Sequence, residues 1–227
     1  SVLPPKAGHH AQNVLRLKEK SELIVFDGLG KQFRARIESI GKKSVAIQLI
    51  TRIDENRESP LNITIGQALT RMDKMDLTIQ KTAELGVSKI IPLLTAKSTI
   101  KLSTDKYKKK MEHWHNLASA ACEQCGRSVV PSIANPINIQ SWLNKLDNSK
   151  EKVGFILDPI AKKTISSLPF SQNIIVLVGP EAGFTEAEVA IAIDKGFYPA
   201  SLGPRILRAE TAGIAAMSII QSVWGDL

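Results

Sequence analysis

Apolar and polar residues alternate along three short stretches near the start of the chain. Residues 22–28 form an apolar run that ends in Asp-Gly, residues 33–37 alternate apolar with basic side chains, and residues 44–50 alternate again after a Gly-Lys-Lys turn. A period of two is typical of half-buried strands, and short strands at regular spacing favour a small β-barrel. We therefore expect a β-barrel over residues 1–58, with basic side chains on its exposed face.

The pattern changes after a charged segment, residues 52–60, which ends in Ser-Pro and is interpreted as a linker. From Leu61 onward, strands alternate with helices, which indicates an α/β domain with a parallel sheet over residues 61–227. The last long strand is a continuous apolar run, typical of the buried middle of such a sheet. The predicted strands start near residue 63 and cover residues 89–93, 129–133, 152–157 and 173–178, and the predicted helices cover residues 74–85, 105–125 and 209–224.

The chain is basic. Its 227 residues include 30 Lys and Arg against 22 Asp and Glu, for a formal net charge of +8 and a pI of about 9.5. This excess favours a polyanionic partner over mere solubility, because each cation that neutralises a phosphate releases a counterion. The lysine-rich residues 106–110 are compatible with either RNA contact or a solvated helix face.

Nothing in the chain predicts a membrane segment or a secretory signal. Apolar residues make up 43% of the sequence, as in ordinary globular proteins. No apolar run approaches the roughly 20 residues that cross a bilayer, and the first residues lack the apolar stretch of a signal peptide. We therefore expect a cytoplasmic protein without membrane contact.

The two cysteines, Cys122 and Cys125, form a C-x-x-C pair. A redox dithiol normally lies at the N-terminus of a helix beside a strand. A zinc site would need two more ligands, for which His113 and His115 are the nearby candidates. The strongly helical sequence around the pair favours a third interpretation, two small residues packed within a helix. No metal is therefore expected.

Two loops follow predicted strands at the edge where open α/β sheets bind ligands. The first, residues 179–183, contains two glycines, which allow a ligand to approach the backbone, and Glu181, an acid that a plain turn does not need. A capping box from Thr185 to Glu188 opens the helix that follows. The loop favours a binding function, with a plain strand-to-helix turn as the alternative.

The second loop places an apolar pair, Ile206 and Leu207, between Arg205 and Arg208. Exposing such a pair in a loop is costly, so it should line either the core or a flat apolar ligand such as adenine. The sequence leaves these two possibilities open. The chain contains neither G-x-G-x-x-G nor a Walker loop, which argues against ordinary dinucleotide and P-loop chemistry.

Six parts of the sequence, from near residue 9 to near residue 212, carry a resemblance to a known family. They are His9-His10 with Val14-Leu15-Arg16, Phe26-Asp27-Gly28, Gln80-Lys81 with Glu84-Leu85-Gly86-Val87, Ala121 with Glu123-Gln124 and Arg127, Gly179-Pro180-Glu181, and Leu202-Gly203 through Ala212. In these stretches the chain resembles the RsmE family of 16S ribosomal RNA uridine-N3 methyltransferases, within the SPOUT superfamily. One departure is Ala182, where the family usually has Gly and where a methyl group restricts positive φ.

The resemblance implies a PUA-like β-barrel followed by a SPOUT domain with a C-terminal trefoil knot, a rare exception to the usual topology rules. It also implies a homodimer and S-adenosylmethionine bound in the knot, with the apolar pair flanking the adenine. The implied cofactor-binding residues are Leu157, Gly179, Pro180, Glu181, Gly183, Leu202, Gly203, Ile206 and Leu207.

The implied activity is methylation of uridine N3 in 16S ribosomal RNA, in the decoding region of the small ribosomal subunit. That nitrogen is protonated at neutral pH, so a carboxylate or an arginine could assist the loss of its proton, and Glu181 and Arg208 are the catalytic candidates. Two other functions stay open: a non-catalytic RNA-binding assembly factor of the same fold, and a SPOUT methyltransferase acting on another RNA. The candidate RNA-binding residues are His10, Arg16, Arg34, Arg36, Lys81 and Arg127.

Overall fold

The computed structural model of the chain describes residues 1–42, 44–98, 104–146 and 152–227. The chain divides into two compact units. Unit 1 comprises Ser1–Arg57 and Gly126–Val129, and unit 2 comprises Glu58–Cys125 and Val130–Leu227.

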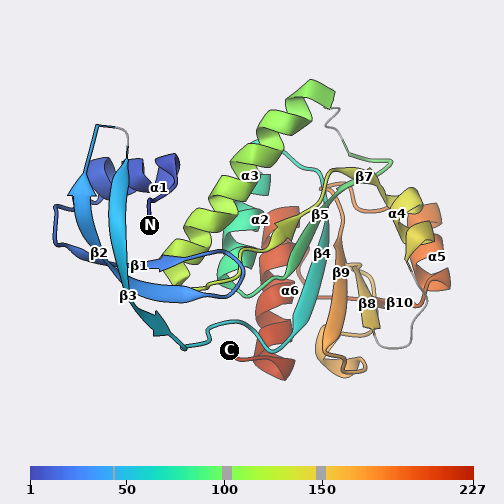
Figure 1. The fold of residues 1–227 in the computed structure, drawn as a ribbon. Coiled ribbons are helices and arrows are strands. Elements are labelled where there is room, and N and C mark those ends of the chain that lie inside the picture. The colour runs from blue at the N-terminus through green and yellow to red at the C-terminus, as the bar shows by residue number, and fades with distance from the viewer. Residues whose placement is uncertain (43, 99–103, 147–151) are drawn as a thin grey trace. The chain divides into compact units, whose positions relative to one another are not determined.

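Unit 1 contains a small antiparallel sheet in the order β1–β2–β3 (Figure 1). Its strands are β1 (Glu22–Phe26), β2 (Gln32–Ile40) and β3 (Val45–Ile53). Because side chains alternate along a strand, Ala35 and Ile37 of β2 are buried while Arg34 and Arg36 are exposed. The alternation predicted from the sequence is therefore confirmed, and what the structure describes of the expected barrel is this antiparallel sheet.

The N-terminal residues complete the core of unit 1. Helix α1 (Pro5–His9) continues directly into the π-helical turn η1 (His10–Val14). Leu3 and Ala11 are buried with the inward-facing residues of β2 and β3 in one small apolar cluster. A core of this size buries little apolar surface, so unit 1 depends on the alternation of its strands for most of its packing.

The segment Gly126–Val129 belongs to unit 1, although it follows a helix of unit 2 along the chain. Gly28, in the turn between β1 and β2, forms an isolated bridge with Val129. The backbone N–H of Gly30 donates to the carbonyl oxygen of Ser128 at 3.1 Å. Unit 1 is thus built from two separate parts of the sequence.

Two boundaries predicted from the sequence are wrong. The strand expected over residues 129–133 is reduced to β6 (Ser132–Ile133), because residue 129 pairs within unit 1. The linker was predicted to begin at residue 52, which is too early. Strand β3 extends to Ile53, which pairs with Gln32 of β2.

Unit 2 contains a parallel sheet, whose described strands run in the order β10–β8–β9–β4–β5–β6, with β7 also paired to β5 (Figure 1). Val176 and Leu177 of β9 are completely buried, as the apolar run predicted. The expected parallel sheet is confirmed. The bounds are β4 (Asn62–Ala68), β5 (Lys89–Leu94), β7 (Ile137–Asn138), β8 (Lys152–Leu157), β9 (Asn173–Val178) and β10 (Phe197–Ala200).

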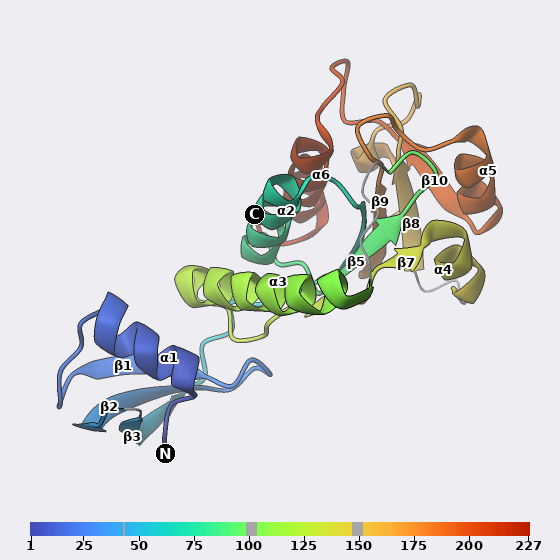
Figure 2. The same cartoon turned by 90° about the horizontal axis from the view of Figure 1, so that it is seen from above.

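Helices cover both faces of this sheet (Figure 2). One face packs against α2, α3 and α6 through a large apolar cluster that includes Trp114 and Met217. The other packs against α4 and α5 through a smaller cluster that includes Trp142 and Phe197. The bounds are α2 (Met72–Glu84), α3 (Thr104–Cys125), α4 (Ile139–Lys145), α5 (Glu186–Asp194) and α6 (Ala209–Trp224), with a short 3-10 turn η2 (Ile165–Ser167).

Both cysteines lie near the end of α3. Cys122 is buried and Cys125 is partly buried. Their position inside a helix agrees with the helical interpretation of the pair, since a redox dithiol would lie at a helix N-terminus. Among the described helices, none is both long and apolar enough to cross a membrane.

Gly154 of β8 offers a test of the packing on the α4 and α5 face. It pairs with Phe197 of β10, and a Cβ at position 154 would approach that ring to 2.6–2.7 Å. We expect Gly154→Ala to lower the free energy of unfolding by about 1–3 kcal/mol, the usual cost of overpacking, as measured by urea denaturation. The double variant with Phe197→Leu should lose less than the sum of the two single losses. An unchanged midpoint for Gly154→Ala would contradict this packing.

Candidate functional site

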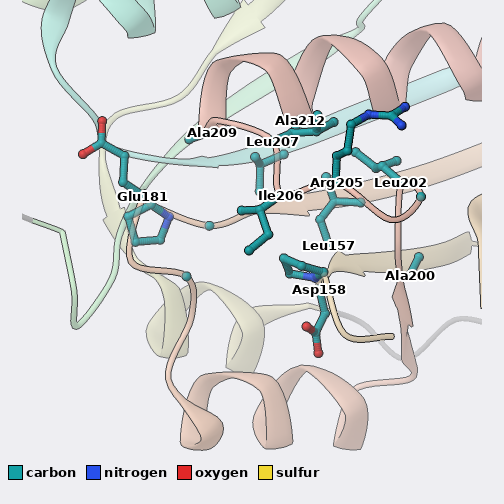
Figure 3. Close-up of a pocket in the computed structure, with 16 residues that line it drawn as sticks. Leu157, Asp158, Glu181, Ala200, Leu202, Arg205, Ile206, Leu207, Ala209 and Ala212 are labelled. Carbon is teal, nitrogen blue, oxygen red and sulfur yellow. The ribbon is translucent and has the colours of Figure 1, made fainter. Parts of the chain in front are cut away.

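A pocket opens at the carboxyl edge of the parallel sheet. The strands β8, β9 and β10 are neighbours and end at Leu157, Val178 and Ala200. Because parallel strands all end at the same edge, the loops that follow them converge there. Together with the start of α6 they enclose a hollow of about 610 Å³, which includes space open to solvent (Figure 3).

The pocket lies beside the point where the chain changes direction in the sheet. From β4 the chain passes through α2 to β5, whereas from β9 it passes through α5 to β10, on the opposite side. Neighbouring strands whose connections diverge leave a crevice between their loops, and open α/β sheets bind ligands at such a crevice.

The structure brings all of the cofactor-binding candidates into this pocket. The nine residues come from three loops that are separated in sequence by up to about fifty positions, yet each lines the same hollow: Leu157, Gly179, Pro180, Glu181, Gly183, Leu202, Gly203, Ile206 and Leu207. The sequence reasoning missed seven further lining residues, most of which adjoin the predicted ones: Asp158, Pro159, Val178, Ala200, Arg205, Ala209 and Ala212. Their position in the sequence is the signal that could have identified them, since each lies at or just after a strand end, beside a predicted residue, or in the first turn of α6.

Two glycines shape the backbone of the pocket. Gly183 has φ 69° and Gly203 has φ 106°, in the region that favours glycine. A Cβ built at either position would meet no atom within 4 Å, so the space beside the backbone is open. A ligand can therefore approach both loops closely.

The apolar pair of the second loop does not belong to the core. Ile206 is 84% exposed and Leu207 is partly buried, although both line the pocket. In Figure 3 the pair lies between Glu181 and Leu157. Of the two possibilities left open by the sequence, core packing is excluded for Ile206. The exposure of this side chain at the rim of a pocket indicates that an apolar part of a ligand covers it.

The loop after β9 is held in place by residues that follow β5, which lies one strand beyond β4 in the sheet. The Nζ of Lys97 donates to the carbonyl oxygens of Ala182 at 3.1 Å and Phe184 at 3.3 Å. One carboxylate oxygen of Glu188 accepts the backbone N–H of Ala96 at 2.8 Å. The other completes the capping box with Thr185, as predicted. These contacts set the loop's shape before any ligand binds.

Ala182 fits this loop without backbone strain. Among the described residues, the non-glycine residues with positive φ are Arg16 and Lys20. Ala182 therefore has an ordinary backbone conformation, and the departure from the family's usual glycine does not distort the loop.

Glu181 lies at the mouth of the pocket, and its carboxylate accepts a hydrogen bond from Lys74 of α2. This bond, and then the charge of the same ammonium, holds the pKa of Glu181 below its ordinary value of 4.5. Burial opposes this and raises the pKa, and the positive charges of Arg71 and Arg208 lower it by smaller amounts. Glu181 is thus an ionised acceptor at neutral pH.

Arg208, the other catalytic candidate, is the N-cap residue of α6 and is exposed. It does not line the hollow itself, whereas its neighbours Leu207 and Ala209 do. Its charge nonetheless acts on Glu181. The structure therefore places Arg208 close enough to Glu181 for its charge to lower the pKa of that carboxyl.

The structure separates the candidate RNA-binding residues into three groups. His10, Arg16 and Arg34 are exposed in unit 1, and Arg36 is exposed but paired with Glu22 at 3.0 Å. Lys81 of α2 is paired with Glu84 at 2.9 Å. Arg127 is only 5% exposed, so its guanidinium is buried rather than presented at the surface. Of the lysine-rich stretch, Lys108 and Lys109 are exposed on α3, and the side chain of Lys106 lies outside the described residues.

One of the two histidines near the cysteine pair, His113, contacts an aspartate of α2. His113 Nε2 lies 2.8 Å from Asp76 Oδ2, and the other oxygen of that carboxylate accepts the indole N–H of Trp114 at 3.0 Å. In the part of the chain that the structure describes, no group of three or more His, Cys, Asp or Glu could hold a metal ion.

Two regions of the chain match known families. Residues 57–221 match the RNA methyltransferase domain family, and residues 3–50 match the RNA methyltransferase PUA domain family. The fold and the site are therefore those of an RNA methyltransferase with an N-terminal PUA domain.

Full-length relatives narrow the assignment. The chain is 38% identical over 220 residues to "Ribosomal RNA small subunit methyltransferase E" of Buchnera aphidicola subsp. Schizaphis graminum, which covers 96% of this chain and 89% of that protein. It is 34% identical to the protein of the same name from Bacillus subtilis, with 93% and 86% covered. The chain belongs to the ribosomal RNA small subunit methyltransferase E family, and the resemblance inferred from the sequence is confirmed.

Solved structures agree with this assignment. The ribosomal RNA small subunit methyltransferase E of Neisseria gonorrhoeae, bound to S-adenosyl methionine, matches with a TM-score of 0.92 and 34% identity, covering 100% of this chain and 93% of that chain. A Legionella pneumophila protein described as a methyltransferase, in complex with the cofactor SAM, matches with a TM-score of 0.95 and 39% identity over the same shares.

The electrostatics of Glu181 can be tested by titration. Because its pKa in the folded protein lies below 4.5, the stabilisation from its ionisation is complete above about pH 4.5 and is lost as the pH falls through the lowered pKa. We expect a carboxyl carbon NMR titration to show a glutamate below its ordinary value, assigned by its disappearance in Glu181→Gln. A Glu181 resonance that titrates at or above 4.5 would contradict the ion pair.

Proposed function

We propose that this chain is an S-adenosylmethionine-dependent methyltransferase that methylates N3 of a uridine in 16S ribosomal RNA, in the decoding region of the small ribosomal subunit. The observation that carries the proposal is the convergence of the nine cofactor-binding candidates on one pocket at the carboxyl edge of the sheet. The relatives support it, since they bear the name of a small-subunit ribosomal RNA methyltransferase and one is bound to S-adenosyl methionine.

The pocket suits S-adenosylmethionine chemically. The exposed side chain of Ile206 and the half-buried Leu207 offer an apolar surface for the adenine. The open backbone at Gly183 and Gly203 allows close contact with the rest of the molecule. Asp158 and Glu181 supply carboxylates near a cofactor that carries sulfonium and ammonium charges, so the donor set complements those charges.

The bound cofactor supplies an electrophilic methyl group. The remaining requirement is at uridine N3, which must lose its proton before or during methylation. The ionised carboxylate of Glu181 accepts a hydrogen bond from N3–H, and the guanidinium of Arg208 stabilises the negative charge that develops on the base. The pocket's fixed loops provide much of the rate enhancement by holding the reacting atoms in line.

In this proposal, unit 1 binds the RNA. Arg34 and Arg36 lie on the exposed face of β2, and His10 and Arg16 are exposed in the N-terminal segment. Contacts from such residues to phosphates give affinity without reading the sequence. The target base must be unstacked to enter the pocket, at a cost of a few kcal/mol. Residues 1–58 thus hold the RNA while residues 61–227 carry out the reaction.

The finer features implied by the family belong to the same proposal. These are a closed PUA-like barrel in unit 1, a C-terminal trefoil knot, a homodimer and a cytoplasmic location. Analytical ultracentrifugation of the purified chain tests the dimer.

Cofactor binding is tested by calorimetry with S-adenosylmethionine. We expect Ile206→Ala to weaken binding about tenfold, because the ligand would cover a side chain that is otherwise exposed. The melting temperature should not change, since that side chain is outside the core. Ile193→Ala, at an exposed position of α5 away from the pocket, is the matched control and should bind like the unaltered protein. Equal affinities for all three proteins would remove the apolar pair from the cofactor site.

Methyl transfer is tested with labelled cofactor and small ribosomal subunits that lack the modification. We expect Arg208→Ala to keep its fold and cofactor affinity, because Arg208 is exposed and outside the hollow, but to lose about 100-fold or more in kcat. Full activity in this variant would exclude Arg208 from the reaction. Absence of transfer by the unaltered protein, at saturating cofactor, would count against the proposed function as a whole.

A further inference from the structure

Lys74 lies in an unusual place for a lysine. It is the third residue of α2, where the positive end of the helix dipole disfavours a cation. Its side chain is only 17% exposed, although lysines are rarely withdrawn from water unless they are paired. Helix stability therefore does not explain why a lysine occupies this position. The explanation lies in the groups that its side chain contacts.

Those partners are two carboxylates on different elements. The ammonium group donates to Glu181 in the loop after β9. It also lies 3.9 Å from Glu210 Oε2, in the first turn of α6. The side chain of Lys74 thus connects α2 to the loop after β9 and to the start of α6, which both border the pocket.

Glu210 is the buried member of the group. Its side chain is 9% exposed, and its Oε2 atom has no hydrogen-bond partner among the described residues. A buried carboxylate is costly unless a nearby charge compensates it. The ammonium of Lys74 is the cation that the structure places within 4 Å of this oxygen. The attraction keeps Lys74 turned toward the sheet edge instead of toward solvent.

We propose that Lys74 is a positioning residue of the methyl-transfer site, held by the buried carboxylate of Glu210 and in turn holding the carboxylate of Glu181 at the mouth of the pocket. The proposal rests on the proposed function for its activity readout. Lys74 does not line the pocket, so it acts through Glu181 and not by touching the cofactor.

The arrangement defines what Glu181 can do. A carboxylate that already accepts a bond from an ammonium is a weak proton acceptor but a well-oriented hydrogen-bond acceptor. Glu181 therefore orients the N3–H of the base, and the proton leaves to solvent. The charged groups that act on Glu181 are Lys74 and Arg71 at the start of α2 and Arg208 at the start of α6. Of these, Lys74 makes the direct contact.

The first experiment compares Lys74→Met with the unaltered protein in methyl transfer and calorimetry. We expect kcat to fall about 10- to 100-fold, the usual cost of a misplaced reacting group. The affinity for S-adenosylmethionine should change less than about threefold, because the pocket lining is intact. The acid limb of the kcat/KM profile should move to higher pH, since the pKa of Glu181 rises when its partner is removed. Lys74→Arg keeps the cation and should restore most of the activity.

Two comparisons separate positioning from a structural role. In a Glu181→Gln background, Lys74→Met should cost less than about threefold, because both changes remove the same interaction. Lys89→Met, an exposed lysine at the start of β5 and thus at the opposite edge of the sheet, should leave activity unchanged. Equal losses from Lys74→Met with and without Glu181, or an acid limb that does not move, would overturn the proposal.

The role of Lys74 can also be tested by measurements that do not require methyl transfer. Carboxyl NMR titration of Lys74→Gln, a milder change that keeps a hydrogen-bond donor, should show a raised pKa for Glu181. Amide exchange at Gly183 should become faster, because the loop loses an anchor. Both shifts without any methyl transfer by the unaltered protein would refute the proposed function while supporting the role of Lys74. Neither shift in a folded variant would refute the role of Lys74.

Discussion

The parallel pairing of β9, with β8 on one side and β4 on the other, is the constraint on which the rest of unit 2 depends. Both faces of β9 are covered by helices, so its apolar residues fix the position of the strand through burial on each side. Parallel strands end at one edge, and the loops after β8, β9 and β10 must therefore meet. The same pairing brings the start of α2, which follows β4, beside the loop after β9.

Once the strands are fixed, polar contacts give the loop after β9 its shape. On the side of the segment that follows β5, Lys97 binds the loop directly and Ala96 binds Glu188 at the start of α5. On the other side, Lys74 of α2 binds Glu181. The loop is thus tied to two neighbouring elements by charged side chains, which form stronger hydrogen bonds than neutral groups do. Preorganisation of this kind suits methyl transfer, where the electrophile is reactive and the geometry of approach limits the rate.

Most of the helices and strands could be predicted from the local periodicity of apolar residues. The alternation in β2, the apolar run of β9 and the capping box at Thr185 each describe contacts within one element, and each was predicted correctly. Helix α4 (Ile139–Lys145) was not predicted, because it is only seven residues long, although Asn138 caps it. The strand predicted from residue 129 began too early, because an apolar pattern does not reveal which sheet a residue will join.

By itself, the sequence determined the class of fold, the loops at the sheet edge and the family to which those loops belong. These follow from residue periodicity and from short motifs, which are local properties. Only the tertiary structure decided that Ile206 is exposed at a pocket, that Arg127 is buried, and that Lys74 meets Glu181 across 107 positions of sequence. Such contacts depend on strand order and on burial, and the physical reason is that residues far apart become neighbours only when the whole sheet has formed.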